Sequence, residues 1–97
     1  MNKKTTTTRA KIESDFVQQV RNEVQEALLH HAPLKWPDER LEVIEDKVLD
    51  NTKMVLAGLS TNELRSPGAL RTHIAQAVAD TKRHIRSIRA ERNGGGE

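Results

Sequence analysis

The stretch HHAPLKWPDERLEVIEDK, residues 30–47, decides how this chain folds. One long pattern of apolar residues at helical spacing ends where this stretch begins. A second long pattern begins within the stretch and continues beyond residue 47. Proline fixes its own backbone angle and lacks an N–H, so Pro33 should end the first helix and Pro37 suits the first position of the next. The stretch therefore separates a long leading helix from a helical hairpin.

On both sides of this connector, apolar residues recur every three or four positions, which is the spacing of one helix face. In residues 8–30 this face consists of Ile12, Phe16, Val17, Val20, Val24, Ala27 and Leu28. In residues 37–59 it consists of Leu41, Ile44, Val48, Leu49, Thr52, Val55, Leu56 and Leu59. In residues 67–92 it consists of Leu70, Ile74, Ala77, Val78, Thr81, Ile85 and Ile88. Ser60 and Glu63 have the spacing of a capping box, which predicts a short helical turn in the linker.

Length and composition agree with a small helical protein. At 97 residues the chain fits one domain, and its contents of 35% hydrophobic and 31% charged residues are typical of exposed helical bundles. We predict an all-α fold, a long N-terminal helix followed by an antiparallel hairpin, over residues 8–92. Residues 1–7 should form a mobile tail and residues 93–97 a flexible one. Because so small a core leaves helices of this length marginal alone, we expect a homo-oligomer.

The chain has no cysteine, which fits a reducing compartment and excludes thiolate chemistry. It also lacks an apolar run that could cross a membrane or serve as a signal peptide. We therefore expect a cytoplasmic protein without a membrane partner.

The sequence offers little for catalysis. His30 and His31 are adjacent and point about 100° apart on a helix, while His73 and His84 lie three turns apart, so we expect no metal site within one chain; a site between subunits stays open. We find no nucleophile beside a base and no glycine-rich phosphate loop. We expect no enzyme, no catalytic residue and no cofactor.

Charge distinguishes the two arms of the hairpin, because residues 37–59 are rich in acids and residues 67–92 in bases. Four bases of the second arm project within about 60° of one another and define a basic stripe. They are Arg71, Lys82, Arg86 and Arg89. The stripe is either a solvated face or a phosphate-binding surface, since guanidinium groups match phosphate oxygens. Trp36 likewise either caps the core or stacks on a purine base.

Three segments resemble a known family: HAP at residues 31–33, RLEVI at residues 40–44, and ALRTHIAQAV at residues 69–78 followed by Ile85-Arg86. The family comprises small phage proteins that act as sponges for cyclic oligonucleotide signals of the bacterial CBASS immune system. The same helical hairpin occurs in sponges directed against Thoeris signalling. The resemblance covers residues 30–87 and implies pockets formed between subunits of a compact oligomer.

The resemblance also implies ligand-binding residues. In that family an aromatic residue before the connector histidine stacks on a base, and this position is His30 here. In that family a basic residue early in the next helix pairs with phosphate. The corresponding position in this chain lies near Glu45, and Lys47 is close by. The late arginine of the family corresponds to Arg86 or Arg89.

These observations predict a phage counter-defence protein that sequesters a cyclic oligonucleotide, or a related nucleotide signal, without hydrolysing it, in the host cytoplasm. The expected ligand-binding residues are His30, Trp36, Lys47, Arg71, Arg86 and Arg89. One alternative is a helical module that inhibits a host or defence protein by binding it. A second is nucleic-acid binding through the basic stripe, which the acidic arm disfavours.

Overall fold

The computed structural model describes residues 8–94 of the chain, with side chains described as far as residue 90. This part of the chain contains only helices, in the order α1 (Arg9–His31), α2 (Asp38–Ala57), α3 (Thr61–Arg65) and α4 (Pro67–Gly94). The all-α prediction is confirmed. The tail expected over residues 1–7, and residues 95–97 of the second tail, lie outside the described residues.

Local signals set the ends of α1 and α2. The Thr8 hydroxyl accepts a hydrogen bond from the Lys11 backbone N–H at 3.2 Å, which caps the start of α1. Pro37 is the residue before α2 rather than its first residue, one position from the prediction. Asp38 and Glu39 occupy the first turn of α2, where carboxylates complement the positive end of the helix dipole. α2 ends at Ala57, two residues before the predicted end.

The linker forms the short helix that its sequence predicts. The Ser60 hydroxyl accepts from the Glu63 N–H at 3.1 Å, and the Ser60 N–H donates to Glu63 Oε1 at 2.7 Å, which completes the capping box of α3. α4 begins at Pro67, as predicted, and continues to Gly94, two residues beyond the expected end.

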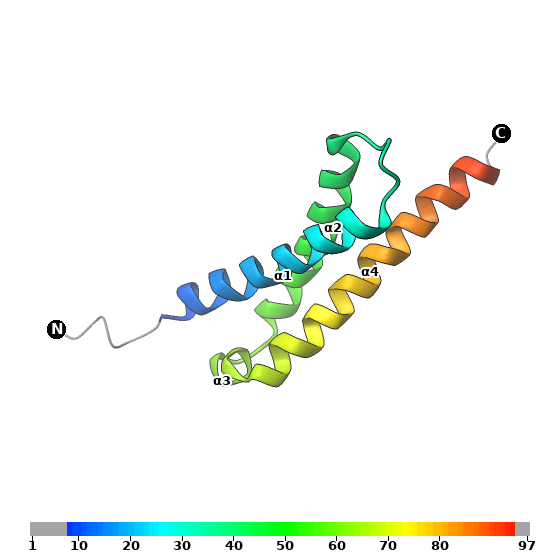
Figure 1. The fold of residues 1–97 in the computed structure, drawn as a ribbon. Helices are drawn as coiled ribbons and strands as arrows, with labels where there is room; N and C mark the ends of the chain where they lie inside the picture. Colours follow the sequence, from blue (N-terminus) through cyan, green and yellow to red (C-terminus); the bar gives the residue numbers. More distant parts are fainter. Residues whose placement is uncertain (1–7, 95–97) are drawn as a thin grey trace.

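The three long helices pack on one another, and α4 packs most extensively on α1. Figure 1 shows α1 and α4 running side by side in the same direction, with α2 crossing behind α1 and α3 at the turn into α4. The structure extends 62 × 21 × 18 Å. Its radius of gyration of 16.1 Å exceeds the value of about 12 Å that a compact domain of this length has. The fold is therefore elongated.

One apolar core joins all four helices and the connector. Its buried members are Phe16, Val20, Val24, Ala27, Leu28, Trp36, Ile44, Val48, Leu49, Leu56, Leu64, Ala77 and Ile85. All of them except Trp36 in the connector and Leu64 in α3 lie on the predicted faces. His73 is buried as well, although no predicted face includes it; it is 5% exposed and lies on the buried face of α4.

Each buried polar side chain of the core has a hydrogen-bond partner within the protein, and Thr81 donates to the Ala77 carbonyl. Thr52 Oγ1 lies 2.8 Å from His73 Nε2 and donates to the Val48 carbonyl at 3.2 Å. The Phe16 ring lies 5.8 Å from the His73 ring, centroid to centroid. Burial lowers the pKa of His73 below its ordinary value, and the nearby Asp80 carboxylate partly opposes that shift. The neutral histidine thus acts as a core residue that links α2 to α4.

Arg9 fastens the start of α1 to the end of α2. Its Nη2 donates to the backbone carbonyls of Leu56 at 2.8 Å and Leu59 at 2.7 Å, and its Nε donates to Glu13 at 2.8 Å. Carbonyls at a helix C-terminus lack partners within the helix and carry partial negative charge, which a guanidinium satisfies. We call this set of contacts the Arg9 clasp.

None of the described helices is long and apolar enough to cross a membrane.

Candidate functional site: a groove between α1 and α2

A groove lies between the first half of α1 and the last turns of α2, and it has a volume of about 550 Å³. Its lining residues are Ala10, Glu13, Ser14, Val17, Gln18, Arg21, Lys53, Leu56 and Ala57. The α1 members recur at three- and four-residue steps, so they form one stripe beside the buried face of the helix. Small-molecule sites usually have volumes of 300 to about 1,000 Å³, and the groove falls within that range.

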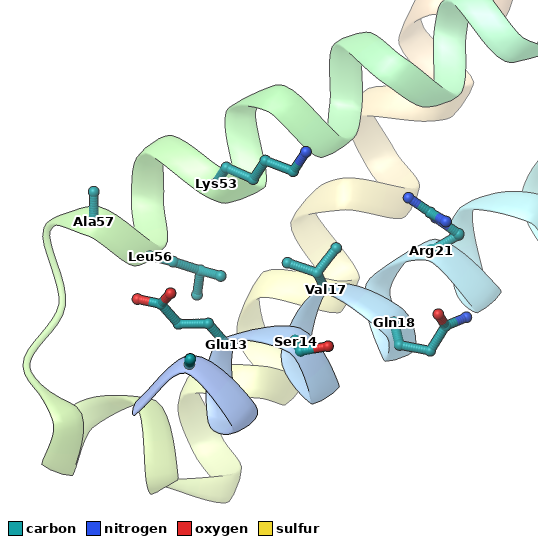
Figure 2. Close-up of a pocket in the computed structure, with 9 residues that line it drawn as sticks. Glu13, Ser14, Val17, Gln18, Arg21, Lys53, Leu56 and Ala57 are labelled. Carbon is teal, nitrogen blue, oxygen red and sulfur yellow. The ribbon is translucent and has the colours of Figure 1, made fainter. Parts of the chain in front are cut away.

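Two cationic side chains reach across this groove. Figure 2 shows Arg21 of α1 and Lys53 of α2 extending toward one another from the two helices, with Val17 and Leu56 between the helices and Glu13 nearer the start of α1. Glu13 is held by the Arg9 clasp. Among the described residues Lys53 has no ion-pair partner. Arg21 also pairs with Glu45, so the two cations and this carboxylate leave this end of the groove with a net positive charge, which favours an anion.

Arg21 is held by a contact between the helices. Its Nε lies 3.4 Å from Glu45 Oε2, which is within ion-pair range, but the buried Nε makes no hydrogen bond of good geometry with any described group. Gln25 donates to the same Glu45 oxygen at 3.2 Å. Glu45, which the resemblance places at a phosphate-binding position, instead anchors α1 to α2 through Arg21 and Gln25.

The three predicted ligand residues near the connector do not form one pocket. His30 is exposed on the surface of α1, and its Nε2 lies 3.1 Å from Glu26 Oε1. Trp36 is 8% exposed and belongs to the core, and the Arg40 guanidinium carbon lies 5.2 Å from its ring centroid. The alternative of core packing is therefore the one that the structure shows for Trp36. Lys47 is exposed on the side of α2 that faces away from the core.

The predicted basic residues of α4 are exposed but spread along the helix. Arg71 lies near the start of α4, and Arg86 and Arg89 lie in its last third. At 1.5 Å per residue, Arg71 and Arg89 are about 27 Å apart, too far to share one small ligand within a chain. None of the six predicted residues lines the α1–α2 groove.

Sequence reasoning missed the groove residues Arg21 and Lys53. Each comes one residue after a member of an apolar helix face, which can be read from the sequence. The packing of their two helices is a tertiary contact, which cannot. The described residues also contain no group of three or more acidic or histidine side chains arranged to hold a metal ion.

No protein-family model, curated protein or solved structure matches the chain. The resemblance to phage sponge proteins thus rests on the residues quoted for it and stays a prediction.

Proposed function

We propose that the protein binds a phosphate-bearing nucleotide in the α1–α2 groove and sequesters it unchanged. The observation that carries this proposal is the approach of Arg21 and Lys53 across the groove. A phosphate between them would relieve their repulsion and accept charge-assisted hydrogen bonds from both. Val17 and Leu56 provide apolar surface against which a base or ribose could pack.

The chemistry of the lining favours binding over turnover. Its carboxylate, Glu13, accepts a hydrogen bond from Arg9 at 2.8 Å, and its hydroxyl group is that of Ser14. No histidine is among the lining residues. A nucleophile needs an adjacent base that is free to accept a proton, and the described lining offers none.

The resemblance supplies the biological setting of the proposal. A phage protein of this kind would withdraw a cyclic oligonucleotide immune signal from its sensor in the cytoplasm of the infected cell. We treat α2 and α4 as the antiparallel hairpin of that family, with α1 laid against it. Binding of phosphate by Arg86 and Arg89, which the resemblance implies, is a competing location for the same ligand.

Isothermal titration calorimetry against cyclic di- and trinucleotides and ADP-ribose cyclisation products tests the proposal. We expect at least one ligand to bind with a Kd below about 10 μM, since a sponge must compete with a tight sensor. Lys53→Glu should abolish that binding. Lys35→Glu, which reverses an exposed lysine in the connector outside the groove, should leave it unchanged.

Chromatography of the ligand after incubation should return it intact. Absence of binding by the whole panel, or equal binding by Lys53→Glu and the wild type, would rule out the groove as a nucleotide site. Loss of binding in Arg86→Glu or Arg89→Glu alone would move the site to α4.

A specific observation also favours the second candidate, a protein-binding module. Leu34 in the connector is 97% exposed, and Leu29 at the end of α1 is also exposed. Large apolar side chains in water are characteristic of interaction surfaces when they cluster. A stoichiometric partner whose binding Leu34→Asp abolishes, while nucleotide binding persists, would support this function.

A further inference from the structure

The outer face of α2 carries a stripe that no described part of the chain covers. Val43 is 52% exposed and Met54 is 73% exposed, and Lys47 and Asp50 lie exposed between them. These four residues follow the spacing of heptad a and d positions and fall within about 60° of one another. We call them the outer stripe. It lies directly opposite the buried Thr52.

The outer stripe is complementary to itself when it is reversed. Positions 43 and 54 lie at equal distances from the midpoint between residues 48 and 49, and so do positions 47 and 50. A twofold axis through that midpoint therefore sets Val43 opposite Met54 of the partner subunit. It also sets Lys47 opposite Asp50 of the partner subunit. Each contact occurs twice, as in any isologous interface.

We propose that two copies of the protein associate through the outer stripes of α2, packed antiparallel about this twofold axis. Charge selects the direction, because a parallel pair would set Lys47 against Lys47 and Asp50 against Asp50. Lys47 and Asp50 form no ion pair with any described residue of their own chain, so both are available.

A residue beside the stripe fits the same axis. Arg40 falls opposite the small residue Ala57 of the partner subunit, which leaves room for the longer side chain.

The size of the surface sets the strength of the dimer. A helix of 20 residues is about 30 Å long and about 10 Å wide, which offers roughly 300 Å² per subunit. Stable dimers bury about 800 Å² per partner. The dimer should therefore be weak, with a Kd of roughly 10 μM to 1 mM, and should strengthen at low salt. Ala57 at the edge of the interface also lines the α1–α2 groove, but none of the four stripe residues does, so the contacts that hold the dimer are separate from the proposed nucleotide site.

Sedimentation equilibrium of the full chain from about 5 μM to 1 mM tests the proposal, with a monomer mass of 10.9 kDa as reference. The interface contains positions 47 and 50 of both subunits. Lys47→Glu makes all four of these positions acidic, and Asp50→Lys makes all four basic. Each change alone should weaken the dimer about tenfold or more. The double variant Lys47→Glu/Asp50→Lys restores opposite charges and should dimerise within about threefold of the wild type.

An equimolar mixture of the two single variants should form a heterodimer, because the acidic stripe then meets the basic one. Lys35→Glu serves as the control for a change of net charge and should leave the dimer intact. A wild-type chain that stays monomeric to 1 mM would overturn the proposal, even if the stripe bound another protein. Single variants that dimerise like the wild type would also overturn it, because self-association would then use another surface.

Discussion

Replacing Arg9 with alanine tests whether the Arg9 clasp stabilises the packing of α1 on α2. The substitution removes the two hydrogen bonds from Nη2 to the carbonyls of Leu56 and Leu59, the bond to Glu13, and a longer one to Thr61 Oγ1 at 3.3 Å. A hydrogen bond to a charged group contributes about 1.5 to 3 kcal/mol, but Arg9 is partly exposed and water replaces part of what is lost. We expect Arg9→Ala to lower the free energy of unfolding by about 2 to 3 kcal/mol.

For a domain of this size, that loss lowers the Tm by about 10 to 20 °C. Thermal and urea unfolding followed by circular dichroism at 222 nm measures both quantities. Lys11→Ala is the matched control, because Lys11 makes only an exposed pair with Asp15 and should change stability by less than about 0.5 kcal/mol. Arg9→Lys keeps the charge without the planar fork and should fall between the two. If Arg9→Ala costs no more than Lys11→Ala, the Arg9 clasp does not hold α1 to α2.

Three further predictions concern the core. Thr52→Val should lower the free energy of unfolding by about 1 to 3 kcal/mol, because it leaves His73 Nε2 unpartnered. Thr81→Val should lower it less, since Thr81 bonds to the Ala77 carbonyl. Urea unfolding of the two variants compares these losses. His73 has a lowered pKa when folded, so the unfolded chain binds its proton more readily; stability should be full above about pH 6.5 and decline as pH falls through the folded pKa. His73→Gln should flatten that decline in urea melts from pH 7.5 to 4.5, and the exposed His31→Gln should not. Ala77→Leu should overfill the packed core and cost about 1 to 3 kcal/mol, against less than about 0.5 kcal/mol for the exposed Ala79→Leu, both measured by thermal melts.

Much of the fold could be predicted because its signals are local. The apolar periodicity of each long helix, the prolines at positions 33, 37 and 67, and the capping pair Ser60 and Glu63 all act within a few residues. The error at Pro37 is one residue, because a proline fits equally well before a helix and at its first position.

The packing of the helices could not be predicted in the same way. The Arg9 clasp joins residues about fifty positions apart, and the contact of Arg21 with Glu45 also depends on how α1 lies on α2. Histidine is usually a surface or ligand-binding residue. His73 can be buried because Thr52, on another helix, provides a hydrogen-bond partner for its ring. Periodicity identifies a helix face but not the polar residue that a neighbouring helix will satisfy.

The same limit explains the candidate site. The predicted ligand residues follow from chemical type, from position along each helix and from the family resemblance, and the tertiary structure spreads them over separate surfaces. The groove residues Arg21 and Lys53 come from different helices, so only their packing brings them together.

The most direct test of nucleotide binding in the groove is a titration of ¹⁵N-labelled protein with a cyclic dinucleotide, followed by ¹H–¹⁵N correlation spectra. We predict that the largest shift changes occur in the amides around Val17, Arg21 and Lys53, saturate at a fixed stoichiometry, and disappear in Lys53→Glu. Shift changes concentrated around Arg86 and Arg89, or no saturable change with any ligand of the panel, would contradict the assignment of the groove as the binding site.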